Sequence, residues 1–176
     1  MKLKVNKIQN NSKNCIICGL ENELGLKAHF YETEGNYLVA VCVGRNEHQS
    51  YPNRMHGGMI CALLDETVGR AIQIGNDDVW GVTGELKIKY RKPVPLGKTI
   101  YCVGKITRDS SRFFLAKGFV EDEAGNLLAE CETTYFKAGV NDITRTDDFK
   151  GTEWFADPNA PKLDYIDIKN LDYFND

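Results

Sequence analysis

Residues 55–69 read Met-His-Gly-Gly-Met-Ile-Cys-Ala-Leu-Leu-Asp-Glu-Thr-Val-Gly, and this stretch decides more about the fold than any other part of the chain. It joins a His-Gly-Gly turn to an apolar pattern of helical period. Gly57 and Gly58 have no Cβ, so a ligand can approach the backbone closely. The first N–H groups of a helix lack intrahelical partners and lie at the positive end of its dipole. The stretch therefore predicts a helix start that can polarise a carbonyl or stabilise an oxyanion.

The helix is expected over residues 56–74, with one apolar stripe at about 100° per residue. The stripe consists of Ile60, Leu63, Leu64, Thr67, Val68 and Ala71. Glu66 lies nearly opposite the stripe, so it is expected to be a surface residue paired with Arg70. Asp65 lies on the flank of the stripe, where a carboxylate is costly to ionise without a hydrogen bond or a purpose. Asp65 is therefore the candidate functional acid, with an ordinary solvated acid as the alternative. The sequence leaves two roles for His56: a residue of the site, or a cap of the helix N-terminus.

The chain has 176 residues, of which 42% are apolar, so it is long enough for one domain with a real core. No run approaches the ~20 apolar residues of a membrane span, and the first residues lead into no apolar signal segment. A cytoplasmic protein is therefore expected. From residue 138 onward, 4 basic residues face 9 acidic ones, which leaves the first 137 residues at +2. This slightly basic part of the chain is better suited to bind a phosphorylated small molecule than duplex nucleic acid, which would call for a stronger basic patch.

Six cysteines do not form the pattern of a disulfide framework. Cys42, Cys61, Cys102 and Cys131 each lie in an apolar or strand-like run, where a free cysteine acts as a small hydrophobe. Cys15 and Cys18 form one Cys-x-x-Cys without a second pair, and the three histidines lack zinc-finger spacing. No metal site is predicted beyond a weak adventitious one at this pair.

Strand-like runs dominate outside the helix. Two precede it, at residues 26–33 and 37–43, and four follow it, at residues 79–91, 99–108, 113–121 and 127–137. The simplest packing of these elements is an α+β fold in which one antiparallel sheet wraps around the helix. Residues 138–176 break the pattern with Asp, Asn, Pro and isolated aromatics. We expect an extension that packs on its own or a neighbouring subunit, with disorder as the alternative.

Several motifs follow one another in order over about residues 14–137. These are the leader Cys15-Ile-Ile-Cys-Gly-Leu-Glu-Asn-Glu-Leu-Gly-Leu26, the His56-Gly-Gly…Leu-Leu-Asp-Glu66 signature, Val82-Thr-Gly-Glu-Leu-Lys-Ile-Lys-Tyr-Arg-Lys-Pro-Val-Pro-Leu-Gly97, and Glu123-Ala-Gly-Asn-Leu-Leu-Ala129. Taken together, these motifs resemble those of the PaaI-like acyl-CoA thioesterases of the hotdog fold. The resemblance implies a thioesterase domain over residues 1–137, followed by the extension.

The resemblance implies that Asp65 is the catalytic carboxylate, acting as general base on water or as nucleophile. It implies that the Gly57 N–H polarises the thioester carbonyl and that His56 helps to shape the site. Thr83 matches a position where a hydroxyl from the partner subunit holds the attacking water; an ordinary strand residue is the alternative. Ser50 stands where the family often carries Asn or Gln. Either Ser50 serves with altered efficiency, or Gln49 or Asn53 substitutes for it through a shift of the loop.

No cofactor is expected, because coenzyme A is part of the substrate, and a thioester is reactive enough to need no metal. Candidate phosphate contacts are Arg91, Lys92, Arg108 and Arg112, and candidate contacts to the thioester and acyl group are Gly58, Met59 and Ile60. We expect a homodimer or homotetramer with sites at the subunit interface. A non-catalytic acyl-CoA sensor and a partner-binding protein that uses its tail are the competing functions. A dehydratase is disfavoured, because Arg70 stands where such enzymes carry a histidine.

Overall fold

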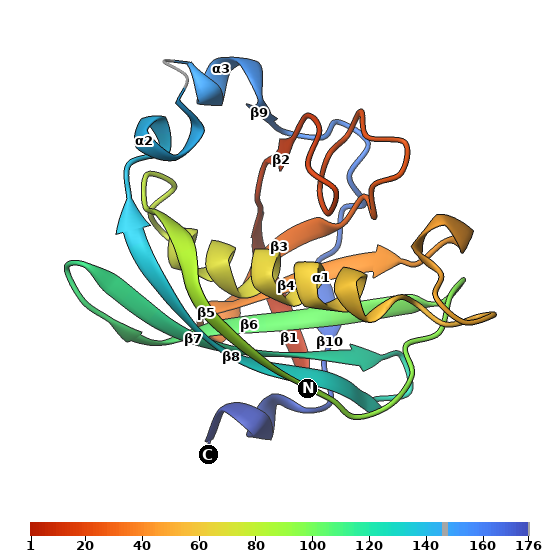
Figure 1. The fold of residues 1–176 in the computed structure, drawn as a ribbon. Helices are drawn as coiled ribbons and strands as arrows, with labels where there is room; N and C mark the ends of the chain where they lie inside the picture. The colour runs from red at the N-terminus through yellow and green to blue at the C-terminus, as the bar shows by residue number, and fades with distance from the viewer. Residues whose placement is uncertain (146–147, 176) are drawn as a thin grey trace.

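The computed structural model describes residues 1–145 and 148–175, which form a curved antiparallel sheet wrapped around one long helix (Figure 1). The main sheet runs, in spatial order, β10 (Tyr165–Asp167), β1 (Lys2–Ile8), β3 (His29–Thr33), β4 (Tyr37–Val43), β6 (Thr99–Asp109), β7 (Phe113–Asp122), β8 (Leu127–Ala138) and β5 (Trp80–Tyr90). Short strands β2 (Asn11–Ser12) and β9 (Trp154–Phe155) pair separately. The helices are α1 (Gly57–Arg70), α2 (Val140–Thr144) and α3 (Phe149–Thr152), with 3-10 turns η1 (Glu34–Asn36), η2 (Asn46–His48), η3 (Ala71–Gln73) and η4 (Leu171–Asn175). The predicted α+β hotdog architecture is confirmed.

Helix α1 begins at Gly57 because His56 caps it. The His56 Nδ1 accepts a hydrogen bond of 2.8 Å from the Gly58 N–H, which satisfies one of the unpaired donors of the first turn. Every residue of the predicted apolar stripe is buried, from Ile60 to Ala71. After Arg70 the chain continues as η3, and Gly75 then reverses it at φ +79°. The predicted helix and its buried face are therefore confirmed.

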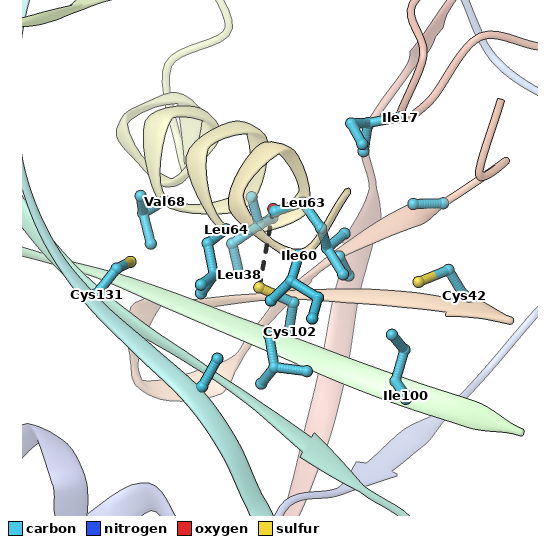
Figure 2. Close-up of a cluster of buried hydrophobic side chains, with 14 of the residues drawn as sticks. Ile17, Leu38, Cys42, Ile60, Leu63, Leu64, Val68, Ile100, Cys102 and Cys131 are labelled. Carbon is cyan, nitrogen blue, oxygen red and sulfur yellow. Dashed lines mark hydrogen bonds between the residues drawn. The ribbon is translucent and has the colours of Figure 1, made fainter. Parts of the chain in front are cut away.

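The main core lies between α1 and the concave face of the sheet (Figure 2). Leu63, Leu64 and Val68 project from the helix onto strands β4, β6 and β8, and the Cys102 Sγ lies 3.8 Å from the Leu63 carbonyl oxygen. Beneath Val68, Gly104 of β6 and Gly118 of β7 are directly paired. A Cβ on Gly118 would lie 2.4 Å from the Val68 Cγ1, so this glycine pair lets the helix sit close to the sheet.

A second core lies on the opposite face of the sheet, and the C-terminal segment covers it. Buried residues from the two ends of the chain meet residues of the central strands there: Leu3, Ile166, Ile168 and Leu171 pack with Tyr31, Val39, Val103 and Phe119. Strand β10 pairs with β1, so residues 165–167 extend the main sheet. The C-terminal turn η4 lies on this outer face, away from α1 (Figure 1). The described residues of the extension thus pack on their own subunit, while 146–147 and 176 lie outside the described part of the chain.

Two features of the N-terminal region differ from the sequence expectation. Strand β1 was not predicted, although Leu3 and Val5 alternate with charged or polar neighbours in the two-residue period of a half-buried strand. The strand predicted over 26–33 begins only at His29, because Lys27 adopts a left-handed conformation with φ 56°. The Leu26 and Ala28 N–H groups bond instead to Ile16 and Ile17 carbonyls of the leader. The leader therefore takes the place of a neighbouring strand there.

Within the described residues, no helix combines the length and apolar character needed to cross a bilayer. All six cysteines are free thiols, as their scattered placement predicted.

Candidate active site

Asp65 is held by two hydroxyl groups from neighbouring strands. The Thr83 Oγ1 of β5 and the Tyr135 hydroxyl of β8 each donate to the Asp65 Oδ1 at 2.8 Å. Thr83 and Tyr135 are directly paired across the two strands, so the sheet register brings both hydroxyls to one oxygen. The Oδ2 atom has no hydrogen-bond partner among the described residues. One carboxylate oxygen is thus fixed, and the other is available to a reactant.

Tyr135 is the buried member of this group. Its hydroxyl also bonds to the Asp65 main-chain oxygen at 2.7 Å, and its ring stacks on Phe114 at 4.8 Å. Burial raises the pKa of Tyr135, and the nearby Asp65 charge raises it further. The phenol therefore remains protonated and acts as a hydrogen-bond donor to the carboxylate.

A cavity of about 150 Å³ lies beside Asp65. Its lining includes Gly69 of α1, Trp80 and Gly81 of β5, and Trp154 of β9. The Trp80 indole N–H is buried and has no partner among the described residues, although its ring packs edge-on against Trp154 at 5.1 Å. Asp65 therefore faces a small hollow with aromatic walls.

Gly57 lies in a second cavity of about 370 Å³, at the start of α1. Its N–H has no acceptor among the described residues, whereas its carbonyl accepts a 2.9 Å hydrogen bond from the Tyr90 hydroxyl. Ser50, Ile60, Arg91 and Lys92 also line this cavity. The structure thus brings Ser50 and two predicted phosphate contacts to the Gly57 end of the helix.

The other candidates near the helix start have structural partners. The His56 side chain caps the helix through the Gly58 N–H, so the capping interpretation of His56 is confirmed. Asn53 adopts φ 61° and donates its N–H to the Gln49 Oε1 at 3.0 Å. Met59 is half-buried and packs against the main core rather than standing free.

The candidate cations are already engaged to different degrees. Arg91 forms a two-pronged ion pair with Glu130 at 2.7 and 3.2 Å, and this contact holds the pKa of the Glu130 carboxyl below its ordinary value. The Lys92 Nζ donates to the Asn126 Oδ1 at 2.8 Å. Arg112 lies exposed in the β6–β7 turn, and Arg108 stacks over Phe113 at 5.6 Å. Arg108 and Arg112 are therefore not brought to the Gly57 cavity.

One expectation about the acidic face of α1 is corrected. Glu66 is not a solvated surface residue: its side chain keeps 26% exposure and contacts the Cys18 thiol at 3.4 Å. Its predicted pairing with Arg70 is present at 3.4 Å. The Thr83 hydroxyl binds Asp65 of its own chain, and its expected role in the site of the partner subunit stays a prediction. The helical wheel could not show the leader that covers this side of α1.

Gly57 and Asp65 are eight residues apart on one helix, which separates them by about 12 Å along the axis. One chain therefore cannot place a single thioester carbonyl against both groups. Sequence reasoning also missed Tyr135 and Tyr90. Both lie in strands that were predicted, but their alignment with α1 depends on sheet register, which hydrophobic alternation alone does not determine.

Comparison with known proteins places this geometry in context. Residues 53–129 match the family model of the thioesterase superfamily. One similar structure is a thioesterase superfamily protein with 23% identity and a TM-score of 0.64; the match covers 69% of this chain but only 59% of that protein. Another is the Escherichia coli PaaI protein of the phenylacetic acid degradation operon, with 13% identity and a TM-score of 0.59; the match covers 65% of this chain and 81% of that protein. A third is a Streptococcus mutans protein bound to acetyl CoA, with 23% identity and a TM-score of 0.54; the match covers 59% of this chain and 82% of that protein. The predicted resemblance to PaaI-like hotdog thioesterases is confirmed at the level of the fold, and the thioesterase superfamily model matches residues 53–129 of the chain.

Proposed function

We propose that this chain, whose residues 53–129 match the thioesterase superfamily, hydrolyses an acyl-CoA thioester to a free acid and coenzyme A. The observation that carries the proposal is Asp65, with one oxygen held by two hydroxyls and the other without a described partner. A fixed carboxylate is suited to general base or nucleophilic catalysis, because its orientation costs nothing at the moment of reaction.

In the reaction, the thioester carbonyl oxygen accepts a hydrogen bond from the unpaired Gly57 N–H at the positive end of α1. With Asp65 as general base, a water oxygen bonds to the carbonyl carbon while its proton passes to the Oδ2 atom. The carbon–sulfur bond then breaks, and the coenzyme A thiolate recovers a proton. With Asp65 as nucleophile, the carboxylate oxygen bonds to the carbonyl carbon and the carbon–sulfur bond breaks, which releases the coenzyme A thiolate to take up a proton. Water then hydrolyses the mixed anhydride to the free acid and regenerates the Asp65 carboxylate.

The separation of Gly57 and Asp65 favours a site shared between two copies of the chain. If two α1 helices lie antiparallel across a twofold axis, Gly57 of one copy approaches Asp65 of the other. Strand β5 forms one edge of the sheet, and Val82, Tyr90 and Phe136 expose apolar surface on or beside it, at 43%, 54% and 52% exposure. This edge is the surface that we assign to the second copy in a homodimer or homotetramer.

The Gly57 cavity is the proposed entry for the coenzyme A portion. Its rim carries Arg54, Arg91 and Lys92, which supply positive charge for phosphate groups. Two similar structures support this ligand class: the Streptococcus mutans protein is bound to acetyl CoA, and a Streptococcus pneumoniae hypothetical thioesterase is described with coenzyme A. Arg91 must share its charge with Glu130, so Arg54 and Lys92 are the stronger candidates.

The test is thiol release from short, medium, long and aromatic acyl-CoAs by the full chain. We expect Asp65→Asn to lower kcat by about 10²–10⁴-fold, the range for loss of a general acid or base, with a small change in KM. Glu132→Gln, which neutralises an exposed carboxylate on β8, serves as the matched control and should keep full activity.

Acyl-CoA binding without turnover in the wild type would replace the proposal with the sensor function. Equal turnover by Asp65→Asn and wild type would remove Asp65 from the mechanism. If folded wild type neither binds nor hydrolyses any of the thioesters, the superfamily match describes the fold and not the activity.

A further inference from the structure

The Cys15–Cys18 turn of the leader packs directly against α1 at Glu66. The two thiol sulfurs and the Glu66 carboxylate all have donor atoms within 4.8 Å of one another. The Cys18 Sγ lies 3.4 Å from the Glu66 Oε1, and the Cys15 Sγ lies 3.9 Å from the Oε2. Glu66 thus adds a third group of the kind that binds metals to Cys15 and Cys18, which alone offer too few ligands for a metal site.

These distances fit the edges of a tetrahedral metal site. With Zn–S bonds of about 2.3 Å and Zn–O bonds of about 2.0 Å, tetrahedral angles place sulfur and oxygen about 3.5 Å apart. The observed distances, 3.4 Å from the Cys18 Sγ to the Oε1 and 3.9 Å from the Cys15 Sγ to the Oε2, lie close to that value, with each sulfur facing a different oxygen of the same carboxylate. Little movement is needed to close the three groups around one ion.

The turn that carries the cysteines is built to hold its sulfurs in place. The Ile17 N–H donates to the Cys15 Sγ at 3.3 Å, and the Ser12 N–H donates to the Cys18 Sγ at 3.4 Å. Gly19 closes the turn through a 2.8 Å bond from its N–H to the Cys15 carbonyl oxygen, and a Cβ there would lie 2.4 Å from the same oxygen. Backbone donors aimed at sulfur favour the thiolate form that binds metals.

The surrounding charges balance when a divalent cation is present. Arg70 lies 3.4 Å from the Glu66 Oε1 and is held between the rings of Phe30 and Trp154, at 4.0 and 4.5 Å. Two thiolates and one carboxylate carry −3, Arg70 contributes +1, and a divalent ion makes the sum zero.

We propose that Cys15, Cys18 and Glu66 bind one Zn²⁺ ion, with water in the fourth position, and that this ion fastens the N-terminal leader to α1. Two sulfurs and one oxygen form a donor set that Zn²⁺ accepts and that Mg²⁺ and Ca²⁺ do not favour. Because the cluster uses none of the groups assigned to thioester hydrolysis, the proposal does not rest on that activity.

Cobalt(II) provides the test, because it reports ligand type and geometry through its colour. The reduced, chelator-treated full chain is titrated with Co²⁺, and Zn²⁺ is then added. We expect one Co²⁺ per chain, a sulfur-to-cobalt charge-transfer band, intense tetrahedral bands in the visible, and loss of all of them on displacement by Zn²⁺. Zinc at 100 times its Kd should raise Tm by about 5–10 °C.

Variants locate the site. Cys15→Ser, Cys18→Ser and Glu66→Gln should each weaken binding at least about 100-fold, since even outer-shell groups are worth about 10–100-fold. The controls are Cys61→Ser, a half-buried thiol on the same helix, and Glu132→Gln, an exposed carboxylate. Both should bind like the wild type. In the wild type, zinc should also protect Cys15 from alkylation, as mapped by mass spectrometry.

Octahedral bands, stoichiometry well below one, or unchanged binding in the three variants would overturn the proposal. It would also fail if the reduced chain took up no metal and Cys15 and Cys18 only formed a disulfide. Circular dichroism of each apo variant separates loss of a ligand from loss of the fold, and the alkylation result in the wild type does not depend on any variant folding.

Discussion

At the scale of single residues, the decisive arrangement is the carboxylate of Asp65 between two hydroxyls. Thr83 and Tyr135 belong to different strands, yet both donate to the same oxygen. The side chain therefore has one orientation imposed by two independent contacts. Hydrogen bonds to a charged group contribute about 1.5–3 kcal/mol each, so their removal should be measurable in catalysis.

We expect Tyr135→Phe and Thr83→Ala each to lower kcat about 10-fold or more, because Asp65 loses an orienting donor in each. The double variant should lose further activity. Steady-state thiol release measures the effect. Tyr31→Phe is the matched control: it removes a buried tyrosine hydroxyl that bonds to the Pro161 carbonyl on the opposite face of the sheet. Tyr31→Phe should lower stability and leave kcat unchanged; equal loss in all three variants would contradict a specific role for the two donors.

At the scale of elements, the contact between α1 and the sheet depends on the paired glycines Gly104 and Gly118. A Cβ on Gly104 would meet the Val68 Cα at 3.0 Å, which is backbone and cannot rotate away. A Cβ on Gly118 would meet the Val68 Cγ1 at 2.4 Å, as well as the Val103 carbonyl oxygen at 2.8 Å. The first clash involves the helix backbone and the second mainly a side chain.

Gly104→Ala and Gly118→Ala should each destabilise the fold by about 1–3 kcal/mol through overpacking. Adding Val68→Ala should relieve the destabilisation by Gly118→Ala more than that by Gly104→Ala, because only the clash at Gly118 is dominated by the valine methyl. Urea unfolding of the single and double variants gives the two coupling energies, expected at about 0.5–3 kcal/mol for the Gly118 pair. A larger coupling for Gly104 would contradict this account of the packing.

The C-terminal segment is attached to strand β3 by Asp157 and His29. Their side chains meet at 2.8 Å and keep only 13% and 18% exposure. This hydrogen bond holds the pKa of Asp157 below its ordinary value. A carboxylate with a lowered folded pKa stabilises the protein fully above its unfolded pKa, and the contribution is lost as the pH falls through the folded value.

The stability difference between the wild type and Asp157→Asn should therefore stay constant from about pH 5 down to about 3.9, the ordinary pKa of aspartate, and shrink below it. Denaturant unfolding across this range measures the difference. Asp142→Asn, an exposed acid in α2, is the control and should show no such trend. A difference that grows toward low pH would contradict the direction of the shift.

The elements also show how far the sequence could be interpreted. Strand β4 and the buried stripe of α1 matched their expected residues, because local period and burial agree there. Strand β1 was missed because its alternation is short and rich in lysine. Of the site, Asp65 and Gly57 could be predicted from one helix, but Tyr135 depends on register and the burial of Glu66 depends on the leader that packs against it. Contacts between segments far apart in the chain carry no periodic signal.

At the scale of the whole molecule, the distance between Gly57 and Asp65 makes subunit exchange informative. Gly57→Pro removes the proposed donor while proline is well accepted at the first position of a helix, and the ψ of 136° at His56 suits a following proline. Gly57→Ala keeps the N–H, and a Cβ there meets Tyr90 only at an ordinary 3.6 Å. We expect Gly57→Pro to be inactive and Gly57→Ala to remain active.

Chains carrying Gly57→Pro and chains carrying Asp65→Asn should then complement one another. Random pairing makes half of the dimers mixed, each with one intact shared site, so co-expression should restore about a quarter of wild-type activity. Thiol release by the unfractionated mixture measures this recovery, and doubly tagged, co-purified dimers, which are all mixed, should reach about half of wild-type activity. Sites contained within one chain would give no recovery, and sedimentation of the same sample reports whether mixed dimers formed.

The pairing of β1 with β10 joins residues 2–4 to residues 165–167. On the ribosome, β1 is translated before all the other strands of the main sheet, whereas its outer neighbour β10 is translated after all of them. Strand β3 can pair with one side of β1, but the other edge of β1 stays unpaired until β10 has been synthesised. The nascent chain therefore carries an open strand edge, which lysines at positions 2, 4 and 7 guard against association with other chains.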